Sequence, residues 1–151
     1  MSDVSRALPL LGADEVAELR AWELRYSAED TSNLAEVLAS WSMHVQRFED
    51  ELDKTLEDHT VWIEYDWLSA QYARNALASA LDGAPERLRR IAQPSVAAVD
   101  AQFERISEVD DAGLLKRMHN SDPTGDGWWW NRVPIRGPVV DALLELPEPP
   151  S

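Results

Sequence analysis

The sequence predicts an all-α fold, a single-domain bundle of four main helices followed by an irregular Trp-rich C-terminal wrap and a short last helix. Two observations lead to this prediction. The stretch between Gly12 and Gly83 contains neither glycine nor proline and is rich in Ala, Leu, Glu and Arg, which lose little side-chain entropy in a helix. Apolar residues also recur there at steps of three and four. The chain of 151 residues has the length of one domain, which we expect over residues 1–146, with the proline-rich residues 147–151 as a disordered tail.

The first two helices are predicted from apolar spacing. Residues 14–26 place Val16, Leu19, Trp22 and Tyr26 on one helical face. The second helix begins near Asn33, which is a capping residue with Glu36 three positions later. It carries an apolar stripe sustained over three heptads, formed by Leu34, Leu38, Trp41, Val45, Phe48, Leu52 and Leu56. Such a stripe suits either the core of one chain or the seam of a homodimer.

The next two helices are bounded by turn and proline signals. We expect a turn at residues 57–60, since one helix from Asn33 to Leu81 would be far longer than is usual in globular proteins. The third helix starts between Thr60 and Asp66 and ends at Asp82, with Gly83 as a left-handed stop. The fourth runs from Pro85 to Ser107 as one helix, kinked at Pro94 because proline frees the carbonyl of Arg90.

The C-terminal segment combines glycine, proline and adjacent tryptophans. We predict a short helical piece over residues 112–118 and a last helix over residues 138–146. If residues 128–130 are extended, either Trp128 and Trp130 cover the bundle while Trp129 faces outward, or the reverse. This segment is interpreted as a hydrophobic lid or as a ligand or partner surface. Arg132 or Arg136 can lie over an indole or pair with an acid from the N-terminal half.

Several classes of function are excluded or left without a motif. The absence of cysteine excludes disulfide scaffolds, thiolate metal sites and cysteine nucleophiles. The sequence contains no zinc-protease, lipase, Walker or dinucleotide-binding motif and no Glu-x-x-His pair. Residues 122–127 resemble the start of a calcium loop, but Val133 stands where the bidentate glutamate is required. We therefore expect no metal and no cofactor.

Charge is the strongest indication of a partner. The chain has 28 acidic and 14 basic residues, a formal net charge of −14, and its acidic excess lies in the N-terminal half. This balance argues against nucleic acid and favours a basic protein. An acidic run is expected near the C-terminal end of the second helix, where carboxylates oppose the helix dipole and repel one another. The run comprises Glu49, Asp50, Glu51, Asp53, Glu57 and Asp58.

In these features the chain resembles the small, acidic, helical immunity proteins and antitoxins that neutralise basic bacterial toxins. The resemblance implies a non-enzymatic inhibitor that binds a toxin domain and occludes its active site. It implies electrostatic contacts from the six carboxylates of the acidic run, and further contacts from Trp129 and Arg132. We expect a cytoplasmic protein without a membrane span, because Asp3 precedes Arg6 and the apolar run that follows is broken by Pro9.

Two other functions remain open. One is an all-α enzyme or small-ligand binder, similar to a nucleotide pyrophosphohydrolase. Carboxylates spaced i, i+3 hold magnesium in that class, and Glu15 with Glu18 and Asp50 with Asp53 have this spacing. Its pocket is expected between the bundle and the wrap, with polar contacts from Arg132, Arg136, Tyr65 and Tyr72. The other is a helical homodimeric structural subunit that pairs through the second helix.

Overall fold

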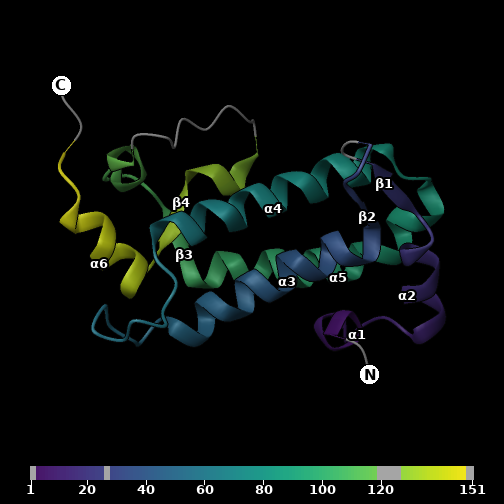
Figure 1. Ribbon diagram of the computed structural model, residues 1–151, viewed down its shortest axis with the longest axis horizontal. Helices are drawn as coiled ribbons and strands as arrows, with labels where there is room; N and C mark the ends of the chain where they lie inside the picture. Colours follow the sequence, from purple (N-terminus) through teal and green to yellow (C-terminus); the bar gives the residue numbers. More distant parts are fainter. Residues whose placement is uncertain (1–2, 26–27, 119–126, 149–151) are drawn as a thin grey trace.

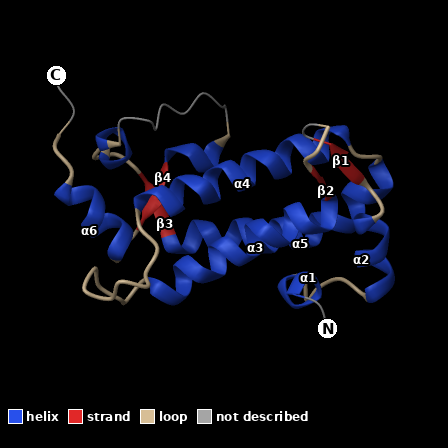
Figure 2. Ribbon diagram, in the orientation of Figure 1, coloured by secondary structure: helices blue, strands red, loops and turns tan. Residues whose placement is uncertain are grey.

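The computed structural model describes residues 3–25, 28–118 and 127–148, and it is mostly helical with two small antiparallel sheets (Figures 1 and 2). The α-helices are α1 Asp3–Ala7, α2 Ala13–Arg20, α3 Leu34–Glu51, α4 Glu64–Gly83, α5 Glu86–Ile106 and α6 Pro138–Glu145. The sheets pair β1 Glu23–Arg25 with β2 Thr31–Asn33, and β3 Ser107–Val109 with β4 Arg132–Pro134. Two 3₁₀ helices, η1 Leu114–Arg117 and η2 Trp128–Asn131, complete the fold. The predicted helical class is therefore confirmed, but the strands were not predicted.

Three long helices form the body of the molecule. Helices α3 and α5 run in the same direction. Helix α4, which lies between them in the sequence, runs in the opposite direction (Figure 1). Asn33 caps α3 by accepting the backbone N–H of Glu36 at 2.9 Å, as predicted. The apolar stripe of α3 is buried from Leu34 to Phe48, so it forms the core of a single chain.

The predicted ends of the first two helices are wrong. Helix α2 stops at Arg20, and residues 23–25 instead pair with residues 31–33 in a short ribbon. Tyr26 lies outside the described residues. Helix α3 stops at Glu51 rather than near Leu56, because the buried Glu51 accepts the backbone N–H of Trp62 and draws the following loop back across the helix. The bundle consequently has three long helices instead of four.

The third and fourth helices lie within a residue or two of their predicted bounds, but one glycine differs from its prediction. Helix α4 begins at Glu64, within the predicted limits, and ends at Gly83, one residue past the predicted end. Helix α5 continues through Pro94 as one helix, with Pro85 as its N-cap instead of its first residue. Gly83 does not adopt the predicted left-handed conformation, since the only described glycines with positive φ are Gly113 and Gly137. The chain leaves α4 through an extended residue, Ala84, instead.

The three tryptophans occupy a 3₁₀ turn instead of an extended segment. A 3₁₀ helix has about three residues per turn, so two consecutive side chains can both face the bundle. Trp129 and Trp130 are accordingly buried against α4, whereas Trp128 is 39% exposed. The predicted alternation is therefore wrong, although the segment does cover the bundle as a hydrophobic lid. The predicted short helix near residues 112–118 is η1, and the predicted last helix is α6.

A buried polar cluster ties α3, α4 and α5 together. The carboxylate of Asp100 on α5 accepts the indole N–H of Trp41 at 3.0 Å. It also accepts two hydrogen bonds from the guanidinium of Arg74 on α4, at 2.8 and 3.0 Å. The same guanidinium lies 4.4 Å from the ring centroid of Trp129. One ion pair thus fixes all three long helices and the tryptophan turn relative to one another.

Parts of two predictions fall outside the described residues. The calcium-like loop lies there up to Asp126, as do residues 149–151 of the predicted tail. The preceding Glu148 pairs with Arg117 at 3.4 Å. No helix in the described ranges combines the length and the apolar content needed to cross a membrane.

Candidate protein interface

The acidic run lies at the end of the bundle where α3 and α5 both finish (Figure 1). We call this region, together with the loop of residues 52–63, the acidic end. The unsatisfied carbonyls of two helix C-termini give it a negative potential before any side chain is counted. The last turn of α3 contains no basic residue. Carboxylates here are therefore held against an unfavourable dipole.

Glu51 is the first member of the run whose predicted role is wrong. Glu51 is only 5% exposed, so it cannot serve as an accessible contact. One carboxylate oxygen accepts the backbone N–H of Trp62 at 2.7 Å, and the other accepts Nε of Arg47 at 2.7 Å. Arg47 lies 4.6 Å from the Trp62 ring centroid and donates to the carbonyl of Thr60. Glu51 therefore anchors the loop that carries the other acids.

Two other members of the run, the exposed Asp53 and the half-buried Asp58, already have partners. Asp53 accepts Nε of Arg136 at 2.8 Å, and this hydrogen bond lowers the pKa of the Asp53 carboxyl. The Asp53 pair also confirms that an arginine of the wrap reaches an acid of the N-terminal half. Asp58 accepts the hydroxyl and the backbone N–H of Thr60, and these bonds lower the pKa of Asp58. Asp53 is neutralised within the chain, while Asp58 keeps its charge.

Glu49, Asp50 and Glu57 keep unpaired charges at the acidic end. Gln46 donates to Asp50 at 2.9 Å, and Gln102 of α5 donates to Glu49 at 2.9 Å. These amide contacts orient the two carboxylates without neutralising them. Glu57 is exposed in the loop. None of the three forms an ion pair within the described parts of the chain.

The structure adds three acids that sequence reasoning missed. Glu104 lies in the last turn of α5, Glu108 lies in β3 and Asp111 follows β3; all three are exposed. They form no ion pair with another described residue. These acids lie at and after the predicted end of the fourth helix, but the sequence did not show that this end lies at the same end of the bundle as the end of α3. Lys54, Arg105 and Arg136 are exposed cations of this region, and its carboxylates outnumber them.

Trp129 and Arg132 do not occupy the exposed positions expected of partner contacts. Trp129 is buried beside Arg74. Arg132 donates to the Ser107 hydroxyl at 2.8 Å and to the carbonyls of Glu104 and Ser107. It therefore joins β4 to the end of α5. Trp128 is the exposed indole of the segment.

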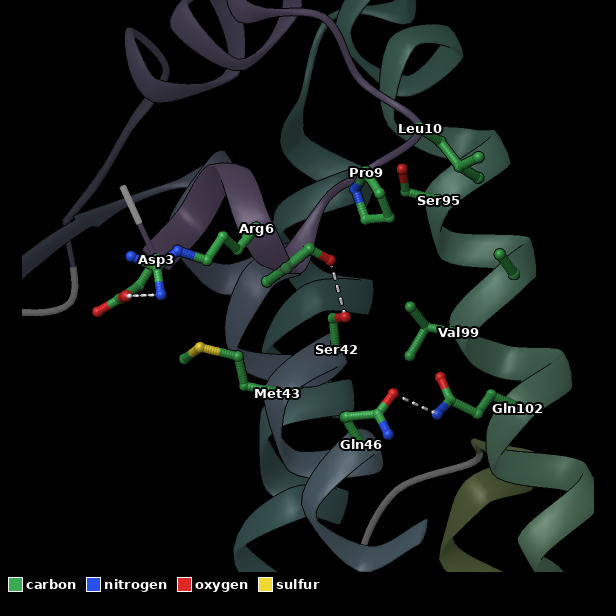
Figure 3. A pocket seen from close by; sticks show the side chains of 12 residues that line it. Asp3, Arg6, Pro9, Leu10, Ser42, Met43, Gln46, Ser95, Val99 and Gln102 are labelled. Carbon is green, nitrogen blue, oxygen red and sulfur yellow. Dashed lines mark hydrogen bonds and ion pairs between the residues drawn. The ribbon is translucent and has the colours of Figure 1, made fainter. Parts of the chain in front are cut away.

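A groove of about 410 Å³ lies beside the acidic end, between α1, α3 and α5 (Figure 3). One wall is α3, with Ser42, Met43 and Gln46, and the facing wall is α5, with Ser95, Ala98, Val99 and Gln102. Helix α1 and the following residues close its remaining side, with Leu10 exposed at the rim. The hydroxyl of Ser42 donates to the carbonyl of Ala7 at 2.9 Å and holds this segment in place.

The arrangement needed for a pyrophosphohydrolase is not formed by the predicted residues. Glu15 caps the backbone N–H of Gly12, and Glu18 pairs with Arg87 at the start of α5. Both lie on α2, at the opposite end of the bundle from Asp50 and Asp53 (Figure 1). Within the described ranges, no group of three or more metal-ligating side chains could hold an ion.

The predicted pocket between the bundle and the wrap is small. A cavity of about 140 Å³ lies there, lined by residues that include Gln71 and Trp130. Ligand pockets usually measure about 300 to 1,000 Å³. Arg132, Arg136, Tyr65 and Tyr72 do not line this cavity. The groove between α1, α3 and α5 is the larger of the two spaces.

Comparison with protein-family models, curated proteins and solved structures finds no match for this chain. The chemistry of the acidic end is therefore the basis for interpreting it. Its carboxylates can attract and bind cationic side chains. The adjoining groove can accept apolar ones.

Replacing Arg136 by Gln should raise the pKa of Asp53 towards its ordinary value of 3.8, because the hydrogen bond from Arg136 is the main cause of the lowered pKa. A lowered folded-state pKa contributes stability above the unfolded-state pKa, and this contribution is lost as the pH falls through the folded-state pKa. The stability difference between wild type and variant should therefore shrink below a pH of about 4. NMR titration of the Asp53 carboxyl measures the shift. Lys54→Gln is the control and should leave the Asp53 pKa in place.

Proposed function

We propose that this chain is a binding protein that holds a basic protein partner against its acidic end. We further propose that the partner is a toxin domain, which the chain neutralises in the manner of an immunity protein or antitoxin. The observation that carries the proposal is the meeting of unpaired carboxylates from separate segments at one end of the bundle. Glu49, Asp50 and Glu57 come from α3 and its loop, and Glu104 and Glu108 come from the end of α5 and β3.

The unfavourable placement of these groups supports a binding role. Carboxylates beside helix C-termini cost stability, and like charges near one another add to that cost. A cationic partner removes both penalties on binding. Complementary charge also raises the rate of association and makes it sensitive to salt.

Apolar side chains near the acidic end support a protein as the partner. Ile63, Val109 and Ile135 are exposed around the loop and the β3–β4 ribbon. Protein interfaces commonly combine such apolar contacts with a charged rim. A soluble cation or a simple polycation would not use these side chains. A folded basic domain offers both kinds of contact.

Neutralising Asp50 and Glu57 tests the proposal. The double variant Asp50→Asn, Glu57→Gln should bind the basic partner with an association rate lowered roughly five- to tenfold at low ionic strength. The partner is first captured from a lysate of the source organism on immobilised wild-type protein, then purified and measured by stopped flow. The matched control is Asp14→Asn, Asp82→Asn, which removes two exposed charges at the other end of the bundle. It should leave the rate nearly unchanged.

Two outcomes contradict the proposal. One is the recovery of no basic protein from the lysate by the wild-type chain. The other is an equal loss of rate in both double variants, which would mean that only net charge matters. The toxin assignment has its own test: co-expression of the wild-type chain should restore growth to cells that express the captured protein, and no growth defect in those cells would refute this part.

A further inference from the structure

The groove between α1, α3 and α5 is lined mainly by apolar groups and by polar groups that already have partners within the chain. Arg6 and Asp3 at its α1 edge pair at 3.9 Å, whereas the buried hydroxyl of Ser95 has no hydrogen-bond partner among the described residues. The Ser42 hydroxyl donates to Ala7, and Gln102 donates to Gln46 at 3.1 Å as well as to Glu49. By contrast, Leu10 is 59% exposed and Met43 is 48% exposed. An occupant of the groove therefore gains mainly by burying apolar surface.

The dimensions of the groove suit a short stretch of helix. A cavity of about 150 Å³ holds one benzene, so a volume of about 410 Å³ accommodates about two to three apolar side chains. The α5 wall extends from Ser95 to Gln102, about 10 Å at a rise of about 1.5 Å per residue. Apolar residues at i, i+4 and i+7 of a partner helix cover the same length. The residues that line the groove belong to helices and to the turn after α1, so they present no strand edge to an extended peptide.

Charge determines which helix fits. Gln46 and Gln102 form the end of the groove nearest the acidic end and hold Asp50 and Glu49 beside it. A helix that carries Lys or Arg next to its apolar face gains contacts with these two carboxylates. A second copy of this chain would bring the same carboxylates and a net charge of −14, and would be repelled.

From these observations we infer that the groove binds the apolar face of a basic amphipathic helix of the partner protein. The inference rests on the proposed function, since it takes the partner to be basic. It adds a second contact region, which extends from the acidic end along α3 and α5 to Leu10. The acidic end attracts the partner, and the groove provides the apolar anchor.

Two synthetic helical peptides of equal charge test the inference. The first carries Leu at positions i, i+4 and i+7 with Lys elsewhere, and the second has Ser in place of each Leu. Wild-type protein should bind the Leu–Lys peptide roughly tenfold more tightly than the Ser–Lys peptide, because only the former buries apolar side chains. Fluorescence anisotropy at constant salt gives both dissociation constants.

Variants assign the difference to the groove. Ala98→Trp fills the groove from α5, and Leu10→Ser removes an exposed apolar group from its rim. Both should weaken the Leu–Lys peptide towards the affinity of the Ser–Lys peptide and leave the latter unchanged. The matched control is Leu144→Ser, which removes a similarly exposed leucine on α6, outside the groove. Circular dichroism establishes that each variant is folded.

The outcomes separate the inference from the proposed function. Equal affinities for both peptides, unaffected by Ala98→Trp, would overturn the groove inference and leave the acidic-end proposal standing. A Leu–Glu peptide bound as tightly as the Leu–Lys peptide would overturn the basic character of the occupant. If neither Lys peptide binds and no basic protein is captured, the proposed function itself fails.

Discussion

Replacement of Asp100 by Ala is expected to lower the free energy of unfolding by about 3 kcal/mol. The carboxylate of Asp100 is the charged partner of Arg74, whose side chain is 9% exposed, and it also accepts the indole N–H of the buried Trp41. Its removal leaves a buried guanidinium without a counter-charge and a buried N–H without an acceptor. The expected loss lies at the low end of the range for buried pairs because the Asp100 side chain keeps 18% of its exposure.

A second variant separates the lost charge pair from lost packing. In Arg74→Met, Asp100→Asn the guanidinium is gone and the amide oxygen can still accept from Trp41, so this protein should be more stable than Asp100→Ala. Denaturant unfolding of the wild type, Asp100→Ala and the double variant, analysed with a common m value, gives the free energy of unfolding of each protein. If Asp100→Ala costs less than about 1 kcal/mol, a value typical of surface ion pairs, then the cluster does not hold the bundle together.

The long helices could be predicted because their signals are local and repeated. The stripe from Leu34 to Phe48 and the cap at Asn33 both lie within the helix that they define. Pro85 and the apolar spacing after it fix α5 in the same way. Helix interiors of this kind depend on periodicity, which the sequence displays directly.

Helix ends could not be predicted where distant contacts decide them. The apolar period continues to Tyr26 and to Leu56, yet α2 and α3 stop earlier. In the first case residues 23–25 pair with a strand eight residues further on, and in the second Glu51 accepts a hydrogen bond from Trp62. The apolar spacing within each helix indicates neither the strand that pairs with residues 23–25 nor the hydrogen bond from Trp62.

The same limit applies to the candidate interface. The acidic run is evident in the sequence, but the sequence does not show which of its carboxylates are accessible. Glu51 is buried, Asp53 pairs with Arg136, and Asp50 has no cationic partner among the described residues. The contribution of Glu104 and Glu108 depends on α3 and α5 ending together. The groove is formed by α1, α3 and α5, which are far apart in the sequence, so no local motif predicts it.

The effect of a glycine also depends on its surroundings in the fold. Replacing Gly137 by Ala is predicted to lower the free energy of unfolding, and replacing Gly83 by Ala is predicted to raise it. Gly137 has φ +104° and ψ −167°, a backbone region that is almost exclusive to glycine. A Cβ at this position would lie 2.8 Å from the carbonyl oxygen of Leu52. Gly137→Ala should therefore lower the free energy of unfolding by about 2 to 5 kcal/mol, through backbone strain together with the forced movement of a neighbouring backbone.

Gly83→Ala is the matched control, and its effect should be a gain. Gly83 has no positive φ, and a Cβ there would meet no atom within 4 Å. Alanine at such a site stabilises by about 0.4 to 1 kcal/mol, because it restricts the unfolded chain. Thermal and denaturant unfolding of both variants gives the two signs; a small or stabilising effect of Gly137→Ala would refute the close approach to Leu52. Since Leu52 directly follows Glu51, the strain in Gly137→Ala should also displace the loop of Glu57 and weaken binding of the Ser–Lys peptide, whereas Gly83→Ala leaves that binding intact.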